Sequence, residues 1–244
     1  MTTSNLPLYA LQFAYDSNNY EKNLNVLKEL AEQTEKNSVV VAPELCLTHF
    51  SFDHMQKAAD FGKEAMSEIK QLSKDRIFAF SLTEEINGKF YNTAKIIYNG
   101  EIVHSQPKHK LFTFGFEDKY FTSGEEENIK IITIGELKFA ILICFEIRFI
   151  DLWKRIQGAD IILIPALWGK LRKEQFESIT KALAIINQAF VVASDSANAD
   201  MAKGSGIITP FGKEFRNDEK NIIFHNANLQ EIKKMRRYMN IGLQ

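Results

Sequence analysis

Two spacings of apolar residues organise this chain of 244 residues. Short runs that are continuously apolar, or that alternate with polar residues, are typical of strands. Such runs occur at 6–14, 39–41, 77–82, 90–98, 101–104, 129–134, 137–143, 160–165, 190–193 and 222–224. Apolar residues recur at helical spacing in 18–37, 54–73, 149–157, 174–188 and 228–239, while 204–215 indicates a strand, a turn and a return strand. Strands that alternate with helices predict an α/β fold with parallel strands.

Tight-turn dipeptides add antiparallel pairs to the predicted sheet. Asn87-Gly88 and Asn99-Gly100 are each flanked by β-forming residues, which is typical of a hairpin, so we expect a mixed sheet. No repeat, low-complexity tract or linker divides the chain, and we therefore expect one domain over residues 1–244. Residues 105–128 show little periodicity, and so long an irregular segment in a compact domain is usually functional.

One cysteine follows the most apolar stretch of the chain. The run at 139–143 is continuously apolar, and Cys144 comes directly after it, before the charged residues Glu146 and Arg148. Such a run predicts a strand that is buried on both faces. Cys144 would then lie at the carboxyl edge of a sheet, where ligands bind in open α/β proteins. It is therefore a candidate nucleophile, although a free cysteine can also serve only for packing.

Three charged residues also fall at strand ends or in the irregular segment. Glu44 follows the strand at 39–41, and Lys108 and Glu117 lie within 105–128. Loops of this kind collect at one edge of a sheet, so these side chains are candidates to converge on Cys144. A carboxylate could take the thiol proton, and an ammonium group would favour the thiolate and a developing oxyanion. That set suits acyl transfer from an amide, whereas the alternative is that these are ordinary surface charges.

Composition and charge argue against several other classes of function. Hydrophobic residues make up 45% and charged residues 25%, as in ordinary globular proteins. The net charge of -1 favours neither nucleic acid nor an anionic membrane as a partner. No apolar stretch approaches the roughly 18 residues of a membrane span, and the N-terminal stretch lacks the pattern of a secretory signal. With two cysteines and no export signal, we expect reduced thiols and a cytoplasmic location.

We expect no metal and no cofactor. The five histidines lack the spacing of metal ligands, and neither cysteine belongs to a CxxC motif, which argues against a thiol redox protein. Among the histidines, His109 is interpreted as structural because it lies beside Lys108. Cys46 is interpreted as a packing residue, although its position two residues after Glu44 leaves open a place near the pocket.

Several patches of sequence, taken in order, carry a family resemblance. They are VVVAPEL at 39–45, PKHKLF at 107–112, FEDKYFTSG at 116–124 and ILICFEIRF at 141–149, with FYNTAKIIYNGEIV at 90–103, DIILIPALWG at 160–169 and SGIITPFG at 205–212. Together they resemble the nitrilase (carbon–nitrogen hydrolase) superfamily over almost the whole chain. The segment CFEIRF resembles the amidase-type branch that contains the ω-amidases.

The resemblance implies a role for each candidate residue. Cys144 is the nucleophile, Glu44 the general base and then the general acid, and Lys108 the lysine that holds the oxyanion. Lys108 is chosen rather than Lys110 because the family's lysine is followed by two residues and then an apolar one. Glu117 matches the second glutamate that positions substrate in many members. The backbone N–H of Phe145 would be a further oxyanion donor, and Arg148 would bind a substrate carboxylate or support the turn.

The resemblance also implies a fold, a reaction and a partner. The fold is a four-layer αββα sandwich, and members usually pair as homodimers through the helix after the cysteine. The reaction is hydrolysis of a C–N bond in a small linear amide through a thioester, with release of ammonia or an amine. An N-carbamoyl amine or amino acid amidohydrolase is the alternative within this chemistry. A non-catalytic partner protein that retains the fold is the alternative outside it.

Overall fold

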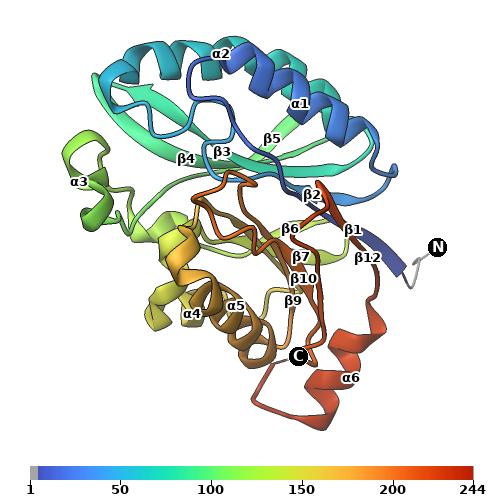
Figure 1. Cartoon of the computed structure of the whole chain (residues 1–244). Coiled ribbons are helices and arrows are strands. Elements are labelled where there is room, and N and C mark those ends of the chain that lie inside the picture. Colours follow the sequence, from blue (N-terminus) through green and yellow to red (C-terminus); the bar gives the residue numbers. More distant parts are fainter. Residues whose placement is uncertain (1–4, 244) are drawn as a thin grey trace.

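The computed structural model describes residues 5–243, so 1–4 of the N-terminal stretch considered above and Gln244 lie outside it. Two six-stranded sheets lie face to face, and helices cover the outer face of each one (Figure 1). This arrangement confirms the expected four-layer αββα sandwich with mixed sheets. Within residues 5–243, no helix has both the length and the apolar character needed to cross a bilayer.

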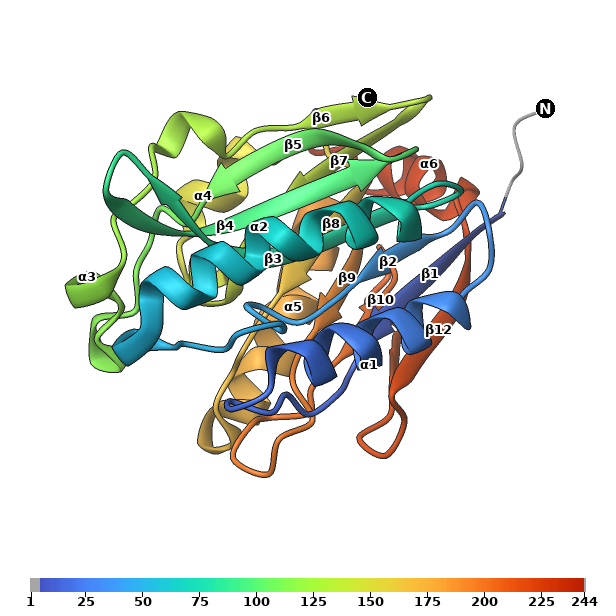
Figure 2. The same cartoon turned by 90° about the horizontal axis from the view of Figure 1, so that it is seen from above.

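The first sheet is built mainly from the N-terminal half of the chain. In spatial order it contains β12 (Ile222–Asn228), β1 (Asn5–Leu11), β2 (Val39–Val41), β3 (Ile77–Ile86), β4 (Lys89–Tyr98) and β5 (Glu101–Pro107). Strands β1, β2 and β3 are parallel, and the other pairs are antiparallel. Helices α1 (Tyr20–Glu32) and α2 (Met55–Leu72) cover its outer face, as the view from above shows (Figure 2).

The second sheet comes from the C-terminal half. Its order is β11 (Glu214–Arg216), β10 (Gly206–Ile208), β9 (Phe190–Ser194), β8 (Ile161–Pro165), β7 (Leu137–Ile141) and β6 (Ile132–Ile134). Strands β7, β8 and β9 are parallel, and β6, β10 and β11 are added antiparallel. Helices α4 (Ile150–Arg155) and α5 (Lys173–Asn187) cover its outer face (Figure 1). The short helix α3 (Glu117–Tyr120) and the C-terminal helix α6 (Gln230–Tyr238) complete the fold.

The two-residue period of the strands divides the core into two clusters. On β1, Leu8 and Ala10 belong to the cluster that includes residues of both sheets, whereas Tyr9 and Leu11 belong to the one that includes residues of α1 and α2. Successive side chains of a strand point to opposite faces, so a sheet that is covered on both faces has strands that are apolar at every position. The continuous apolar runs in the sequence follow from this double burial.

Both predicted hairpins are present. Asn87 and Gly88 have φ values of 52° and 75°, and Asn99 and Gly100 have φ values of 51° and 79°. Two consecutive residues in the left-handed region form the turn whose twist suits a two-residue hairpin. These turns join β3 to β4 and β4 to β5.

Several predicted boundaries differ from the structure. The first strand ends at Leu11, and the strand expected at 129–134 begins at Ile132. The strand expected at 137–143 ends at Ile141, although Leu142 still donates its N–H to the Leu163 carbonyl of β8 at 3.0 Å. In all three cases the strand is shorter than predicted, because the apolar run in the sequence extends beyond the paired residues.

Residues 105–128 contain more regular structure than we predicted. β5 continues to Pro107, and 3₁₀ turns at Thr113–Gly115 and Glu126–Asn128 flank the one-turn helix α3. Each piece is too short to show a helical period in the sequence. Phe116, with φ of 61°, separates the first 3₁₀ turn from α3 and prevents the two from joining into one longer helix.

Candidate active site

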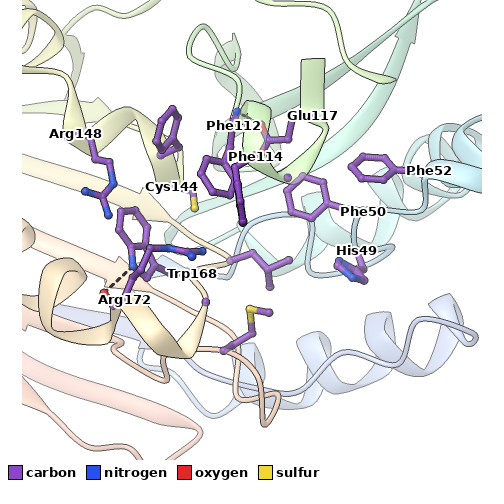
Figure 3. Close-up of a pocket in the computed structure, with 15 residues that line it drawn as sticks. His49, Phe50, Phe52, Phe112, Phe114, Glu117, Cys144, Arg148, Trp168 and Arg172 are labelled. Carbon is purple, nitrogen blue, oxygen red and sulfur yellow. Dashed lines mark hydrogen bonds between the residues drawn. The ribbon is translucent and has the colours of Figure 1, made fainter. Parts of the chain in front are cut away.

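Residues after strands of both sheets meet at one edge of the sandwich. Glu44 follows β2 and Lys108 follows β5 in the first sheet, while Cys144 and Leu167 follow β7 and β8 in the second. These residues follow the carboxyl ends of their strands, and ligands of α/β proteins bind at that edge of a parallel sheet. Figure 3 shows Cys144 and Glu117 at this edge, among aromatic side chains.

A buried ion cluster lies at the centre of the site. The Lys108 ammonium donates to Glu44 Oε1 at 2.7 Å and to Glu117 Oε1 at 2.8 Å, and none of the three side chains is more than 4% exposed. Asn92 Nδ2 donates to the same Glu44 oxygen at 2.7 Å, and the Leu167 N–H donates to the other Glu44 oxygen at 3.1 Å. Both oxygens of Glu44 therefore have fixed partners, which hold this carboxylate in one orientation.

The cluster carries two carboxylates for one ammonium group. Burial alone would lower the pKa of Lys108, but the charges of Glu44 and Glu117 outweigh it and raise that pKa above its ordinary value. Burial raises the pKa of Glu117, and the Lys108 charge opposes this shift. Lys108 is consequently a permanent cation, whereas Glu117 binds a proton more readily than an exposed glutamate does.

Cys144 is held beside this cluster in an unusual backbone conformation. It begins a 3₁₀ turn, Cys144–Arg148, with φ of 47°, a region that residues other than glycine rarely adopt. Such conformations cluster at functional sites, where the surrounding structure maintains them. Burial and the nearby Glu44 charge raise the pKa of the Cys144 thiol well above its ordinary value, despite opposing effects of Lys108 and the Leu167 N–H. The resting thiol is therefore protonated, so attack on a substrate needs a base.

The Phe145 side chain forms part of the wall of the site. Its ring packs against Phe112, with ring centroids 4.9 Å apart, and against Phe149 at 5.2 Å. The Phe145 N–H lies in the first turn of the 3₁₀ helix, where N–H groups lack a partner within the helix. The Phe145 N–H is thus a hydrogen-bond donor close to the Cys144 sulfur, and the turn itself does not use it.

A cavity of about 790 Å³ opens in front of Cys144. Six of the fifteen residues that line it are Phe or Trp: Phe50, Phe52, Phe112, Phe114, Phe145 and Trp168. Arg148 and Arg172 also line it: the Arg148 guanidinium lies 4.8 Å from the centre of the Trp168 ring, and that of Arg172 5.4 Å from the Phe112 ring. The cavity is therefore apolar around most of its wall, and its charged residues are Arg148, Arg172 and Glu117.

Within residues 5–243, neither cavity arginine has an acidic partner, and the Arg148 guanidinium donates to the neutral side-chain oxygen of Gln175. Arginine ion pairs within residues 5–243 are formed by Arg155, Arg216 and Arg236. Burial lowers the pKa of Arg148, and the positive charge of Arg172 lowers it further, so the two guanidinium groups lie within range of mutual repulsion. An anionic group in the cavity would relieve this repulsion.

The structure brings Glu44, Lys108 and Glu117 into direct contact and places Cys144, Phe145 and Arg148 around the same cavity. Sequence reasoning missed Asn92, Leu167 and Arg172. A signal existed for Asn92, which stands in a strand pattern where apolar residues are expected. Leu167 contributes through its backbone, and Arg172 acts through its position at the cavity, so residue type indicated neither of them.

The remaining candidates lie outside the chemistry of the cavity. Cys46 is buried and free, and burial raises the pKa of its thiol to about 12, so it is a packing residue as interpreted. His109 Nδ1 lies 2.8 Å from the Gly124 carbonyl oxygen, which is consistent with a structural role in the segment that follows β5 and carries Lys108 (the lysine loop). Among residues 5–243, no group of three or more His, Cys, Asp or Glu side chains could hold a metal ion.

Comparisons with known proteins show which proteins this chain is similar to. The model of the carbon–nitrogen hydrolase family matches residues 10–237. A 2-oxoglutaramate amidase of Bacillus subtilis is 30% identical over 93% of this chain and 92% of its own. A deaminated glutathione amidase of Escherichia coli O157:H7 is 26% identical over 82% of this chain and 81% of its own. The structure of a CN-hydrolase superfamily protein, XC1258 from Xanthomonas campestris, superposes with a TM-score of 0.85 at 18% identity, covering 96% of this chain and 95% of that one.

Proposed function

This chain belongs to the carbon–nitrogen hydrolase family, and we propose that it hydrolyses a small linear amide through a thioester formed on Cys144. Membership makes it an enzyme that acts on C–N bonds other than peptide bonds. The observation that carries the proposal is the buried contact of Lys108 with both Glu44 and Glu117, beside a protonated thiol at the base of the cavity. Glu44, Lys108 and Cys144 form the catalytic triad in this proposal.

Acylation begins at the thiol. Glu44 takes the proton as Cys144 Sγ attacks the amide carbon, because the high pKa of the thiol leaves little thiolate in the resting enzyme. The oxyanion forms near the Lys108 ammonium and the Phe145 N–H, which stabilise the developing negative charge. Glu44 then returns its proton to the leaving nitrogen, the C–N bond breaks, and ammonia or an amine departs.

Deacylation uses the same groups in reverse. Glu44 takes a proton from a water molecule as that water attacks the thioester, and the proton passes to the departing sulfur. Glu117 accepts a hydrogen bond from the Lys108 ammonium and another from the Phe112 N–H at 3.1 Å, so it orients the lysine and the cavity wall together. This arrangement supports a positioning role for Glu117.

The charge of the cavity bears on the substrate. Arg148 and Arg172 have no carboxylate partner within residues 5–243, and guanidinium groups bind carboxylates through charge-assisted hydrogen bonds. We therefore propose that the substrate carries a carboxylate away from the scissile amide, and that Arg148 binds it. The Bacillus subtilis relative acts on 2-oxoglutaramate, which has this property. N-carbamoyl amino acids share it and are the alternative class.

Three further features are proposed on narrower support. One apolar cluster includes residues of both sheets, which favours a single domain over residues 1–244. Two free cysteines favour a reducing compartment, in agreement with a cytoplasmic location. Exposed apolar side chains at the end of α5 and around α6 favour a homodimer: Ile185, Ile186, Phe211, Tyr238, Met239 and Ile241. Light scattering after size exclusion tests the dimer, and the Ile186→Asp variant should weaken it.

The decisive experiment measures ammonia release and intact mass across ω-amides of dicarboxylic acids, N-carbamoyl amino acids, neutral amides and nitriles. Wild type is compared with Cys144→Ala. Turnover that disappears in the variant, with an acyl adduct on wild type alone, is the expected result. An inactive wild type whose Cys144 also resists an alkylating reagent would instead indicate a non-catalytic protein that retains the fold.

A further inference from the structure

Glu146 is a buried carboxylate that the proposed mechanism does not use. It lies two residues after Cys144, and its side chain is fully buried. The Lys108 charge acts on Glu146, but the ion pairs of Lys108 are made with Glu44 and Glu117. A buried charge without a salt-bridge partner requires compensation from hydrogen bonds.

Backbone N–H groups supply that compensation from two different loops. Glu146 Oε2 accepts the Ile143 N–H at 2.7 Å, and Glu146 Oε1 accepts the His109 N–H at 2.7 Å. Ile143 immediately precedes the proposed nucleophile, and His109 immediately follows the proposed oxyanion lysine. One side chain thus joins the backbone next to Cys144 to the backbone next to Lys108, although 37 residues separate Glu146 from His109.

Apart from Glu146, separate sets of backbone hydrogen bonds hold the turn at Cys144 and the lysine loop. The Lys108 N–H donates to the Asn92 carbonyl at 2.8 Å, and the Lys108 carbonyl accepts the Gly124 N–H at 2.8 Å. Neither of these bonds involves the turn at Cys144. The turn at Cys144 is closed by the Glu146 N–H, which donates to the Ile143 carbonyl at 3.0 Å. Glu146 therefore closes the turn that holds Cys144 at positive φ and also connects that turn to the lysine loop.

We propose that Glu146 is a positioning residue that sets the place of the Cys144 sulfur relative to the Lys108 ammonium. The inference rests on the proposed function, in which these two groups act on the same reacting carbon. Its side chain touches neither group directly, so it acts through the two backbones. A displacement of about 1 Å between reacting groups can reduce a rate about a hundredfold, which is the scale on which such a tie matters.

The test uses Glu146→Gln and Glu146→Asp. The amide of Gln can accept one N–H and turns its own NH₂ toward the other, and Asp keeps the charge but is too short to reach both loops. The matched control is Ser73→Ala, because Ser73 Oγ also joins two backbone segments: it donates to the Lys70 carbonyl at 2.8 Å and accepts the Gly100 N–H at 3.1 Å. Ser73 precedes β3, at the opposite edge of the sheet from Glu44.

We expect Glu146→Gln to reduce kcat about tenfold to a hundredfold, with KM changed by less than about threefold. Glu146→Asp should recover part of the loss. The pH profile of Cys144 alkylation by iodoacetamide should shift in Glu146→Gln, because Glu44 raises the pKa of the thiol and Lys108 lowers it, and a displacement of the sulfur changes the balance of these two effects. Ser73→Ala should lower Tm and leave kcat and the alkylation profile unchanged.

Two results overturn the proposal. One is a folded Glu146→Gln enzyme with wild-type kcat and a wild-type alkylation profile. The other is rapid hydrogen exchange of the Ile143 and His109 amides in wild type, a measurement that needs no variant. If wild type hydrolyses no amide in the panel, the proposed function fails. The alkylation profile and the exchange rates still decide whether Glu146 joins the two loops.

Discussion

Replacing Lys108 with methionine removes the cation from a cluster of two buried carboxylates. Its Nζ lies 2.7 Å from Glu44 Oε1 and 2.8 Å from Glu117 Oε1. At an effective dielectric constant of about 20, unit charges at these separations attract by about 6 kcal/mol per pair. Desolvation of the charges offsets much of this, and loss of one partner from a buried ion pair costs about 3–5 kcal/mol. For a chain of this size, we expect Tm to fall by about 6–20 °C.

The loss of stability should depend on pH in a defined direction. Without Lys108, the pKa of the buried Glu117 carboxyl group rises further above the ordinary glutamate value of 4.5, because the charge that opposes the effect of burial is gone. The folded variant then binds more protons than the unfolded chain at pH above that value, so its stability falls as pH rises. The difference in unfolding free energy between wild type and Lys108→Met should therefore be smaller at pH 5 than at pH 8. Urea denaturation at both pH values measures it.

Lys108→Met should also have a lower kcat, measured at a temperature at which the variant remains folded. Loss of one oxyanion donor reduces kcat by about 10²–10³-fold, and Lys108 also orients Glu44. Lys110→Met is the matched control, because the Lys110 ammonium lies 5.3 Å from the centre of the Phe149 ring and outside the cluster. A Lys108→Met enzyme with more than a tenth of wild-type kcat, or an equal deficit at pH 5 and pH 8, would refute this reasoning.

Glu44→Gln should reduce kcat about 10²–10⁴-fold and yet move Cys144 alkylation to lower pH, because the Glu44 charge raises the pKa of the thiol; alkylation moving to higher pH would contradict this. Arg148→Gln should raise KM about tenfold to a hundredfold for amides that carry a carboxylate and leave neutral amides unaffected, as initial rates on paired substrates would reveal. Burial lowers the pKa of His49 from 6.5 to about 4, so between these pH values the unfolded chain binds more protons than the folded one. Wild type should therefore lose up to about 3 kcal/mol of unfolding free energy as pH falls from 6.5 to about 4. His49→Asn, which tolerates the φ of 54° at this position, should not show that loss in denaturation curves at pH 4 and pH 7.

Local chemistry in the sequence was sufficient for most elements of the fold. Continuous apolar runs marked strands covered on both faces, and the Asn-Gly pairs at 87–88 and 99–100 marked both hairpins because two successive residues there must adopt positive φ. Element ends were less predictable. Leu142 and Ile143 are as apolar as the strand before them, so residue type does not show that β7 ends at Ile141.

The order of strands and helices also allowed candidate residues to be chosen from strand ends, and the resemblance assigned roles to Glu44, Lys108 and Cys144. Residue type could not distinguish Lys108 from Lys110. The difference is one of burial, since the Lys108 side chain is fully buried between two carboxylates. Burial depends on segments remote in the chain: 64 residues separate Glu44 from Lys108, and 123 separate Glu44 from Leu167.

The sequence by itself therefore determined the alternation of elements, the turns and the chemical types available at the sheet edge, because each of these depends on a few neighbouring residues. Only the tertiary structure decided that Asn92 and the Leu167 N–H orient Glu44, that Arg172 joins Arg148 in the cavity, and that Glu146 connects the cysteine turn to the lysine loop. It also decided that burial and the Glu44 charge raise the pKa of the Cys144 thiol well above its ordinary value. The physical reason is that desolvation and electric fields are set by every group packed around a site, and packing brings those groups together from the whole length of the chain.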